Sequence, residues 1–137
     1  MTPPSDSPPV APSSGAQRLI GYDIDLSGGD GRARVVLQVD DRHVNRIGCL
    51  HGGIIAMMLD AAAGFSAALV RGPELAPLVT VALNTQYIAA ATGGRVVATG
   101  RVKQAGGSIC YADAELRDAD GRLLATADGV FKYLRRG

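Results

Sequence analysis

One carboxylate interrupts a long, almost wholly apolar stretch of the chain. Residues 48–69 read GCLHGGIIAMMLDAAAGFSAAL, with Asp60 as the only acidic residue. The sequence His51-Gly52-Gly53 lies near its start. If a helix begins near Gly52, its first backbone N–H groups have no partner within the helix and carry the positive end of its dipole. Glycines leave these amides uncovered, so Gly52 and Gly53 form a candidate site for a carbonyl oxygen or an anion.

Asp60 lies eight residues beyond Gly52. A rise of about 1.5 Å per residue places it about 12 Å along the helix axis, too far for both groups to reach one atom within a chain. In a two-fold dimer with antiparallel helices side by side, the Asp60 of one subunit can meet the Gly52 amide of the other. The spacing therefore predicts two shared sites per dimer. The alternative is a structural Asp60, hydrogen-bonded to a neighbour or exposed on the helix surface.

The spacing does not favour other reactive constellations. His43 and His51 are the only two histidines, and no HxxxH or HExxH spacing joins them, so no metal site is expected. No serine lies in a G-x-S-x-G context. Cys49 and Cys110 lack a CxxC spacing and are expected to be small, reduced core residues of a cytoplasmic protein.

The charge is nearly balanced, with 14 basic and 13 acidic residues and a formal net charge of +1. Such a chain has no strong field to gather nucleic acid or an anionic membrane, so neither is expected as a partner. The apolar stretch itself carries Asp60 and much alanine, and strand-like sequence follows it. These features favour a buried helix over a membrane span.

The elements that must position these residues follow from periodicity. Residues 32–39 alternate apolar and polar side chains, as a half-buried strand does. The helix follows and ends at the Gly72-Pro73 signal. Four further strands, separated by glycine-containing turns, are predicted over residues 78–88, 95–104, 108–116 and 123–133.

Short connections imply antiparallel neighbours, so the last four strands are expected to form a meander. The prediction is an α+β domain in which an antiparallel β-sheet is wrapped around one long central helix. Residues 17–137 are expected to form this single domain. Residues 1–16 hold five of the seven prolines and no basic residue, and are expected to be a disordered leader rather than a secretory signal.

The order Asn45-x-x-Gly48-x-x-His51-Gly52-Gly53, with Asp60 nine residues after the histidine and the strand VTVALNTQYIAAA downstream, resembles the hotdog-fold acyl-CoA thioesterases. The likeness is to their phenylacetate-degradation, or PaaI-like, branch and covers about residues 20 to 133. It implies a hotdog fold and hydrolysis of acyl-CoA by a homodimer with shared active sites. It also implies that two such dimers pair into a tetramer. Coenzyme A is then part of the substrate, and no separate cofactor is implied.

The resemblance also implies roles for individual residues. The Gly52 amide polarises the thioester carbonyl, and His51 helps to orient the thioester. The Asp60 of the partner subunit activates water as a general base or attacks the carbonyl itself, two routes that stay open. Asn45 lies beside the thioester and holds the water or the substrate. Thr80 positions the water for Asp60, or is a plain β-branched strand residue.

Thr80 is expected to share a strand face with Asn84 by the two-residue period. For coenzyme A, the resemblance implies that the turn containing Lys103, Gly106, Gly107 and Ser108 runs near the nucleotide and pantetheine. Glycine-rich turns expose amides to phosphate, and lysine adds a point charge. Tyr87 and Tyr133 match positions that line the same groove. Arg101 and Arg135-Arg136 are expected on the solvated surface.

Three functions are consistent with these residues. The first is an acyl-CoA thioesterase for aryl or medium-chain acyl groups, with the branch resemblance favouring aryl groups. The second is a hotdog dehydratase or hydratase acting on hydroxyacyl thioesters, which needs a basic histidine opposite an acid. His51 at a helix start is poorly placed for that role because the dipole disfavours its protonated form. The third is a non-catalytic acyl-CoA binding protein.

Overall fold

An 18-residue helix, α2 (Gly52–Leu69), forms the centre of the structure, a computed structural model that describes residues 13–135. Alanine, leucine and methionine fill much of it, and these residues lose little side-chain entropy in a helix. Its length and its mean hydropathy of 1.6 also fit a membrane span. Nine of its residues are buried against the rest of the domain, so packing in a core accounts for its apolar composition.

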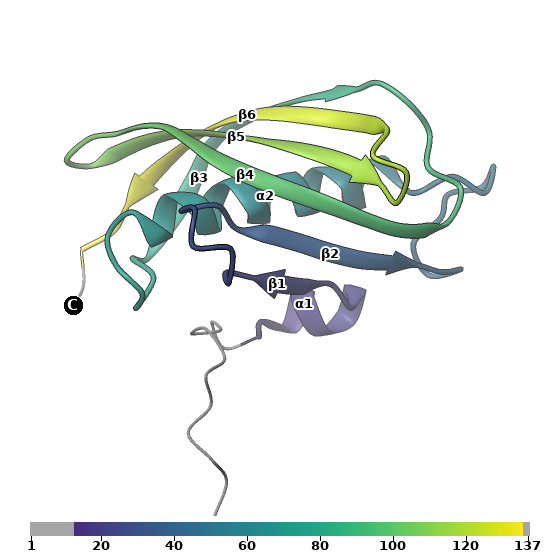
Figure 1. Ribbon diagram of the computed structural model, residues 1–137, viewed down its shortest axis with the longest axis horizontal. Helices are drawn as coiled ribbons and strands as arrows, with labels where there is room; N and C mark the ends of the chain where they lie inside the picture. Colours follow the sequence, from purple (N-terminus) through teal and green to yellow (C-terminus); the bar gives the residue numbers. More distant parts are fainter. Residues whose placement is uncertain (1–12, 136–137) are drawn as a thin grey trace, which may run out of the picture.

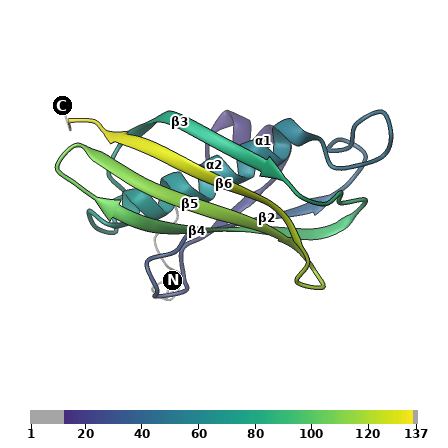
Figure 2. The same cartoon turned by 90° about the horizontal axis from the view of Figure 1, so that it is seen from above.

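Six antiparallel strands form one sheet in the order β1-β2-β4-β5-β6-β3. Their bounds are β1 Asp23–Asp25, β2 Arg34–Val39, β3 Leu78–Tyr87, β4 Gly94–Ala105, β5 Ile109–Asp118 and β6 Leu123–Tyr133. The sheet curves over α2, which lies against one of its faces (Figure 1). Seen from above, β3, β6, β5 and β4 lie side by side over the helix (Figure 2). The predicted α+β class, with an antiparallel sheet wrapped around one long helix, is confirmed.

The strand order differs from the predicted four-strand meander. The strands β4, β5 and β6 are consecutive neighbours, but β3 pairs with β6 and β4 pairs with β2. Residues 88–93 therefore cross from one side of the sheet to the other instead of forming a hairpin. A tertiary hydrogen bond from the Leu50 amide to the Ala91 carbonyl oxygen, 2.7 Å long, fixes this path. The Gly93-Gly94 signal marks a turn but carries no information on which strands become neighbours.

Two elements near the N-terminus have no counterpart in the prediction. The helix α1 (Gly15–Ile20) starts at Ser14, whose hydroxyl accepts a hydrogen bond from the Gln17 amide at 3.1 Å. The strand β1 has three residues and pairs with β2. Both elements are too short to give a periodic signal. Regular structure thus begins two residues before the expected boundary at residue 17, and residues 1–12 of the expected leader lie outside the described residues.

A buried histidine, His43, joins α1 to the segment that leads into α2. Its Nδ1 accepts a hydrogen bond from the Asp40 amide at 2.9 Å, and its Nε2 lies 2.7 Å from the Ile20 carbonyl oxygen. The Asp40 bond assigns the ring hydrogen to Nε2, which donates to Ile20. The His43 carbonyl oxygen accepts from the His51 amide at 2.8 Å. Segments distant in sequence therefore meet at this one residue.

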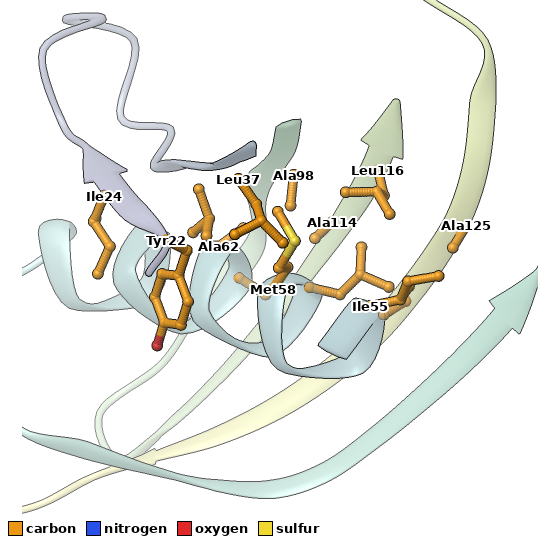
Figure 3. Packing of buried hydrophobic residues seen from close by; sticks show 14 of the residues in the cluster. Tyr22, Ile24, Leu37, Ile55, Met58, Ala62, Ala98, Ala114, Leu116 and Ala125 are labelled. Atoms are coloured by element: carbon orange, nitrogen blue, oxygen red, sulfur yellow. The ribbon is translucent and has the colours of Figure 1, made fainter. Parts of the chain in front are cut away.

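The helix packs directly against the backbone of Gly100 of β4. A Cβ at this position would overlap the Ala62 carbonyl oxygen and the Ser66 hydroxyl. Ser66 is itself buried, and its hydroxyl donates to the Ala62 carbonyl oxygen at 2.8 Å. Other small residues, among them Ala98 of the same strand and Ala114 of β5, face the helix (Figure 3). Small side chains on both surfaces thus let the sheet approach the helix.

The edge strand β3 differs from its neighbour β6. Every second residue from Ala125 to Tyr133 of β6 is buried, whereas β3 has no buried residue. Two apolar side chains of β3, Val79 and Val81, are 46% and 58% exposed. The strand is therefore apolar in composition yet lacks a cover within a single chain.

A bulge between Thr80 and Ala82 interrupts the alternation of side chains along β3. Thr80 lies opposite the buried Phe131 and faces α2, whereas Asn84 lies opposite the exposed Asp128. The prediction that Thr80 and Asn84 share a strand face is therefore wrong, because the extra residue shifts the two-residue period.

Candidate active site

The first turn of α2 presents a free backbone donor. His51 caps the helix, and its Nδ1 accepts a hydrogen bond from the Gly53 amide at 2.9 Å. The His51 carbonyl oxygen accepts from the Ile54 and Ile55 amides at 3.0 and 3.1 Å. Among residues 13–135, the Gly52 amide has no hydrogen-bond partner. This amide is therefore available to an oxygen atom of a ligand, at the positive end of the helix dipole.

Asn45 shapes the loop that precedes this turn. Its Oδ1 accepts hydrogen bonds from the Ile47 and Cys49 amides, each at 3.1 Å. The side-chain oxygen is thus engaged within the loop, and the Nδ2 group is left to donate to a ligand. Cys49 is only partly buried here, unlike the fully buried Cys110, so the expected core position holds for Cys110 alone.

Asp60 lies in the middle of α2, where it contacts β3. The Thr80 hydroxyl donates a hydrogen bond to Asp60 Oδ1 at 2.7 Å. Both residues open onto a groove of about 630 Å³, which we call the Asp60 groove. Its walls are mostly apolar and comprise Tyr22, Asp60, Ala61, Gly64, Phe65, Ala68, Pro73, Glu74, Leu75, Ala76, Leu78, Thr80 and Phe131. A carboxylate with an ordered hydroxyl neighbour thus stands at an apolar pocket, as a general base or nucleophile requires.

Tyr22 lines the Asp60 groove, although no sequence pattern indicated it. Its ring is buried in the core cluster while its hydroxyl points out of the cluster (Figure 3). Burial, and secondarily the negative charge of Asp60, raise the pKa of Tyr22. The hydroxyl therefore remains a neutral donor beside the carboxylate. Tyr22 precedes a three-residue strand, and a lone tyrosine there gives no pattern that relates it to Asp60.

The two candidate halves of the site lie apart within one chain. The residues that line the Asp60 groove do not include Asn45, His51 or Gly52. Along the straight axis of α2, Gly52 and Asp60 are about 12 Å apart. The structure thus keeps the free amide and the carboxylate in separate places, as their spacing in the sequence predicts.

Tyr87, at the end of β3, contacts the first turn of α2. Its hydroxyl donates a hydrogen bond to the Gly52 carbonyl oxygen at 2.7 Å. Its ring lies against the Gly52 Cα, since a Cβ there would be 3.4 Å from the ring atom Cε1. Tyr87 is therefore placed at the candidate oxyanion site, whereas the resemblance implied a wall of the coenzyme A groove.

A second cavity of about 1090 Å³ lies at the other end of α2. We call it the cationic cavity, since it is lined by Arg71, Lys132 and Arg135 together with Glu74, Ala76, Pro77, Gly107, Ser108, Tyr133 and Leu134. It shares Glu74 and Ala76 with the Asp60 groove, so the two hollows adjoin. The expected ligand residues Gly107, Ser108 and Tyr133 are brought together here.

Arg71 holds the turn between β4 and β5. Its guanidinium donates to the carbonyl oxygens of Gly106 and Gly107 and lies 3.7 Å from the centroid of the Tyr133 ring. The Tyr133 hydroxyl donates to the Ala67 carbonyl oxygen at 2.6 Å, and burial raises the pKa of Tyr133 to about 12. Only the ring of Tyr133 can then face a ligand. Arg71 lies two residues beyond the last residue of α2, and a single arginine there gave no sequence signal.

Lys103 does not join this cavity. It lies on the face of the sheet away from α2, where its ammonium donates to Asp128 Oδ1 at 2.8 Å. This pairing raises the pKa of Lys103. A bulge between Val102 and Gln104 interrupts the alternation of β4 at this residue. Arg101 pairs with Asp113 on the same face and is exposed, as expected. Arg135 is exposed too, and Arg136 lies outside the described residues.

Within residues 13–135, no three His, Cys, Asp or Glu side chains lie close enough together to hold a metal ion. His43 uses both ring nitrogens within the fold. His51 uses its Nδ1 to cap α2. The Gly52 amide and the Asp60–Thr80 pair offer hydrogen bonding to an oxyanion, proton transfer and nucleophilic attack.

Comparison with known proteins gives a family for this arrangement. Residues 47–125 match the Thioesterase superfamily, a span that includes the first turn of α2, Asp60 and Thr80. The chain is similar to acyl-coenzyme A thioesterase 13 of Homo sapiens, with 31% identity over 111 residues that cover 80% of this chain and 78% of the human one.

Two solved structures show the same fold. A conserved protein of Pseudomonas aeruginosa is 33% identical, with a TM-score of 0.81 over 89% of this chain and 95% of that chain. A phenylacetic acid degradation-related protein of Ralstonia eutropha is 27% identical, with a TM-score of 0.74 over 89% and 92% of the two chains. These likenesses confirm the resemblance to hotdog thioesterases drawn from the motif. The chain therefore belongs to the thioesterase superfamily and is a thioester hydrolase with the hotdog fold.

Proposed function

We propose that this thioester hydrolase acts on acyl-CoA and that each active site is shared between two subunits. The observation that carries the proposal is the separation along α2 of the free Gly52 amide and the Asp60–Thr80 pair. In an antiparallel pair of helices, the Gly52 amide of one subunit lies opposite the Asp60 of the other. The amide then stabilises the oxyanion, and the carboxylate stands across the thioester carbon.

The surface of a single chain supports such a dimer. The strand β3 lies at the edge of the sheet and has no buried residue. Its Val79 and Val81 are exposed, and Met57 and Ala61 of α2 are only partly buried, so the edge strand and the helix beside it leave apolar surface uncovered. Pairing of β3 with β3 of a second copy would continue the sheet and cover this surface. Tetramer formation by two such dimers is proposed from the family resemblance.

The chemistry has two routes that use one geometry. In the first, Asp60 takes a proton from water, the resulting hydroxide adds to the thioester carbon, and the tetrahedral intermediate expels the thiolate. In the second, the Asp60 carboxylate adds to the thioester carbon, the C–S bond breaks and the thiolate leaves, and water then hydrolyses the resulting anhydride. Label in the Asp60 side chain after a single turnover in ¹⁸O-labelled water would identify the second route, because water that attacks the Asp60 carbonyl of the anhydride leaves its oxygen there.

The cationic cavity supports binding of the coenzyme A phosphates. Arg71, Lys132 and Arg135 line it, and Ser108 adds a hydroxyl. Phosphate groups favour such charged and hydrogen-bonding partners. The cavity adjoins the groove that contains Asp60, so a ligand can extend from one to the other. Because Lys103 is bound to Asp128 on the opposite face of the sheet, it is left out of this phosphate site.

The Asp60 groove supports an aryl or medium-chain acyl group. Small residues of α2, Ala61, Gly64 and Ala68, leave room beside the helix, and the groove includes both phenylalanines of the chain, Phe65 and Phe131. A cytoplasmic location is part of the proposal, because Cys49 and Cys110 are not joined in a disulfide.

Thiol release from a panel of acyl-CoAs tests the proposal. Turnover of at least one aryl or medium-chain acyl-CoA is expected. Formation of an enoyl product without free thiol would instead identify a dehydratase. Binding of acyl-CoA with no turnover across the panel would identify a non-catalytic binding protein.

A further inference from the structure

We propose that Tyr87 is a positioning residue for the oxyanion amide, an inference that rests on the proposed thioesterase function. The Tyr87 hydroxyl holds the carbonyl group of Gly52, and it thereby fixes the direction in which the Gly52 N–H points. Tyr87 thus acts through the backbone of α2 rather than by contact with coenzyme A.

The contact between Tyr87 and Gly52 has two parts. The hydroxyl donates to the Gly52 carbonyl oxygen at 2.7 Å, a short and well-formed hydrogen bond. The ring covers the Cα of Gly52, where an added Cβ would lie 3.4 Å from Cε1 and 3.5 Å from Cζ and from the hydroxyl oxygen. The aromatic ring therefore occupies the side of the backbone that a side chain would otherwise cover.

The peptide group between Gly52 and Gly53 is held on both sides. Tyr87 donates to its carbonyl oxygen, and the Gly53 N–H of the same peptide donates to His51 Nδ1 at 2.9 Å. The preceding peptide group is held at the His51 carbonyl oxygen by the Ile54 and Ile55 amides. The Gly52 N–H belongs to that preceding peptide, so contacts on both flanking peptides define its orientation.

The backbone of a glycine pair depends on such contacts for its rigidity more than the backbone of other residues does. Glycine has no side chain to restrict its backbone, and its conformational freedom is the largest of any residue. An oxyanion donor is effective only if it already points to the place where negative charge develops. The side-chain contacts of Tyr87 and His51 supply the rigidity that the Gly52-Gly53 sequence lacks.

The surroundings of Tyr87 argue against a role in the core. The side chain is 56% exposed and is the last residue of the edge strand β3. Removing its hydroxyl therefore leaves the buried core intact. The substitution Tyr87→Phe keeps the ring against Gly52 and deletes only the hydrogen bond, which isolates the proposed effect.

The test compares kcat and KM of the full-length wild type and the Tyr87→Phe variant on two thioesters. One is the acyl-CoA that the wild type hydrolyses fastest, and the other is the N-acetylcysteamine thioester of the same acyl group, which lacks the nucleotide. We expect kcat to fall about fivefold on both substrates, with KM within about twofold, as for loss of one hydrogen bond that orients a transition-state donor. Tyr111→Phe is the matched control, because Tyr111 is an exposed tyrosine of β5 remote from α2.

Two kinetic outcomes would overturn the inference. A rise in KM for the acyl-CoA, with unchanged hydrolysis of the N-acetylcysteamine thioester, would make Tyr87 a wall of the coenzyme A groove. Equal kinetics for Tyr87→Phe and the wild type on both substrates would remove any role for the hydroxyl. A wild type that releases no thiol would be a failure of the proposed function and not of the Tyr87 contact.

Amide hydrogen exchange provides a readout independent of turnover. We expect the Gly53 amide to exchange about fivefold faster in Tyr87→Phe than in the wild type, because its peptide group loses the hydrogen bond at its carbonyl end. The Tyr111→Phe control should leave this rate unchanged. An unchanged Gly53 rate in Tyr87→Phe would refute the positioning role, whatever the substrate proves to be.

Discussion

The first turn of α2 and the middle of the same helix differ in how much of their stabilisation is local. At the first turn the active group is a backbone amide, and contacts from His51, Ile54, Ile55 and Tyr87 fix the peptides around it. In the middle the active group is the side chain of Asp60, and the hydrogen bond that fixes it comes from Thr80 on another element. The comparison teaches that rigidity at the oxyanion end is mostly local, whereas at the acid end it depends on tertiary structure.

The largest effect is expected where a single side chain carries the function. Asp60→Asn should lower kcat by at least about a hundredfold, on the scale of removing a general base. Thiol release measures the loss, and circular dichroism should show an unchanged fold. The control is Asp128→Asn, which makes the same change on the outer face of the sheet and should leave kcat within about twofold. Unchanged hydrolysis by Asp60→Asn would exclude Asp60 from the chemistry.

The Gly52 N–H, the backbone part of the proposed site, can be removed while the helix is kept. Gly52→Pro deletes the N–H at the first helical residue, where proline is well tolerated, and His51 already has φ −62° and ψ 133°, as a residue before proline requires. We expect a kcat lower by about a hundredfold, as for loss of one oxyanion donor. Gly52→Ala keeps the N–H and should retain most of the activity. If Gly52→Pro and Gly52→Ala had equal activities, the amide would not be the donor.

Loss of the tertiary contact at Asp60 should have a smaller effect. Thr80→Val removes the hydroxyl at nearly constant volume and is expected to lower kcat about tenfold, since one hydrogen bond to a charged group is lost. Thr80→Ser should restore most of the activity because it returns the hydroxyl. A valine variant as active as the wild type would show that the hydroxyl has only a structural role.

The smallest expected change in activity tests whether the Gly52 amide and the Asp60 of one active site come from different subunits. Equal amounts of Asp60→Asn and Gly52→Pro subunits, mixed and allowed to exchange, give half heterodimers, each with one intact site of two. The mixture should therefore recover about one quarter of the wild-type activity, from two nearly inactive parents. Mass spectrometry checks the exchange. No recovery after complete exchange would place both halves in one chain.

Local patterns predicted the fold except for the elements that depend on distant contacts. The helix followed from its long apolar run and the strands from their two-residue alternation, which burial of one strand face imposes. The position of β3 beside β6 did not, since the crossing at residues 88–93 is fixed by a hydrogen bond between Leu50 and Ala91. The elements α1 and β1 are too short for any period to be read.

The same distinction applies to the candidate site. The cap at His51 and the free Gly52 amide follow from the rules for helix starts, and the separation of Gly52 from Asp60 follows from counting residues. The contact between Asp60 and Thr80 needed the family resemblance. Tyr22 was missed because nothing in its local sequence relates it to the groove. Lys103 lies with Arg101 on the outer face of β4, as plain alternation along the strand gives, and only the family resemblance had placed it near the ligand.

The buried His43 has a consequence for shortening the chain. A protein that starts at Tyr22 would lack the Ile20 carbonyl, leaving the Nε2–H of His43 buried with no acceptor. A buried donor without an acceptor lowers the free energy of unfolding by about 1–3 kcal/mol. The lost hydrogen bond would weaken the packing of His43, whose carbonyl oxygen accepts from the His51 amide at the start of α2. A trimmed version for crystallisation should therefore keep α1 from its Ser14 cap onward, although α1 lies outside the sheet and contributes no residue to either hollow.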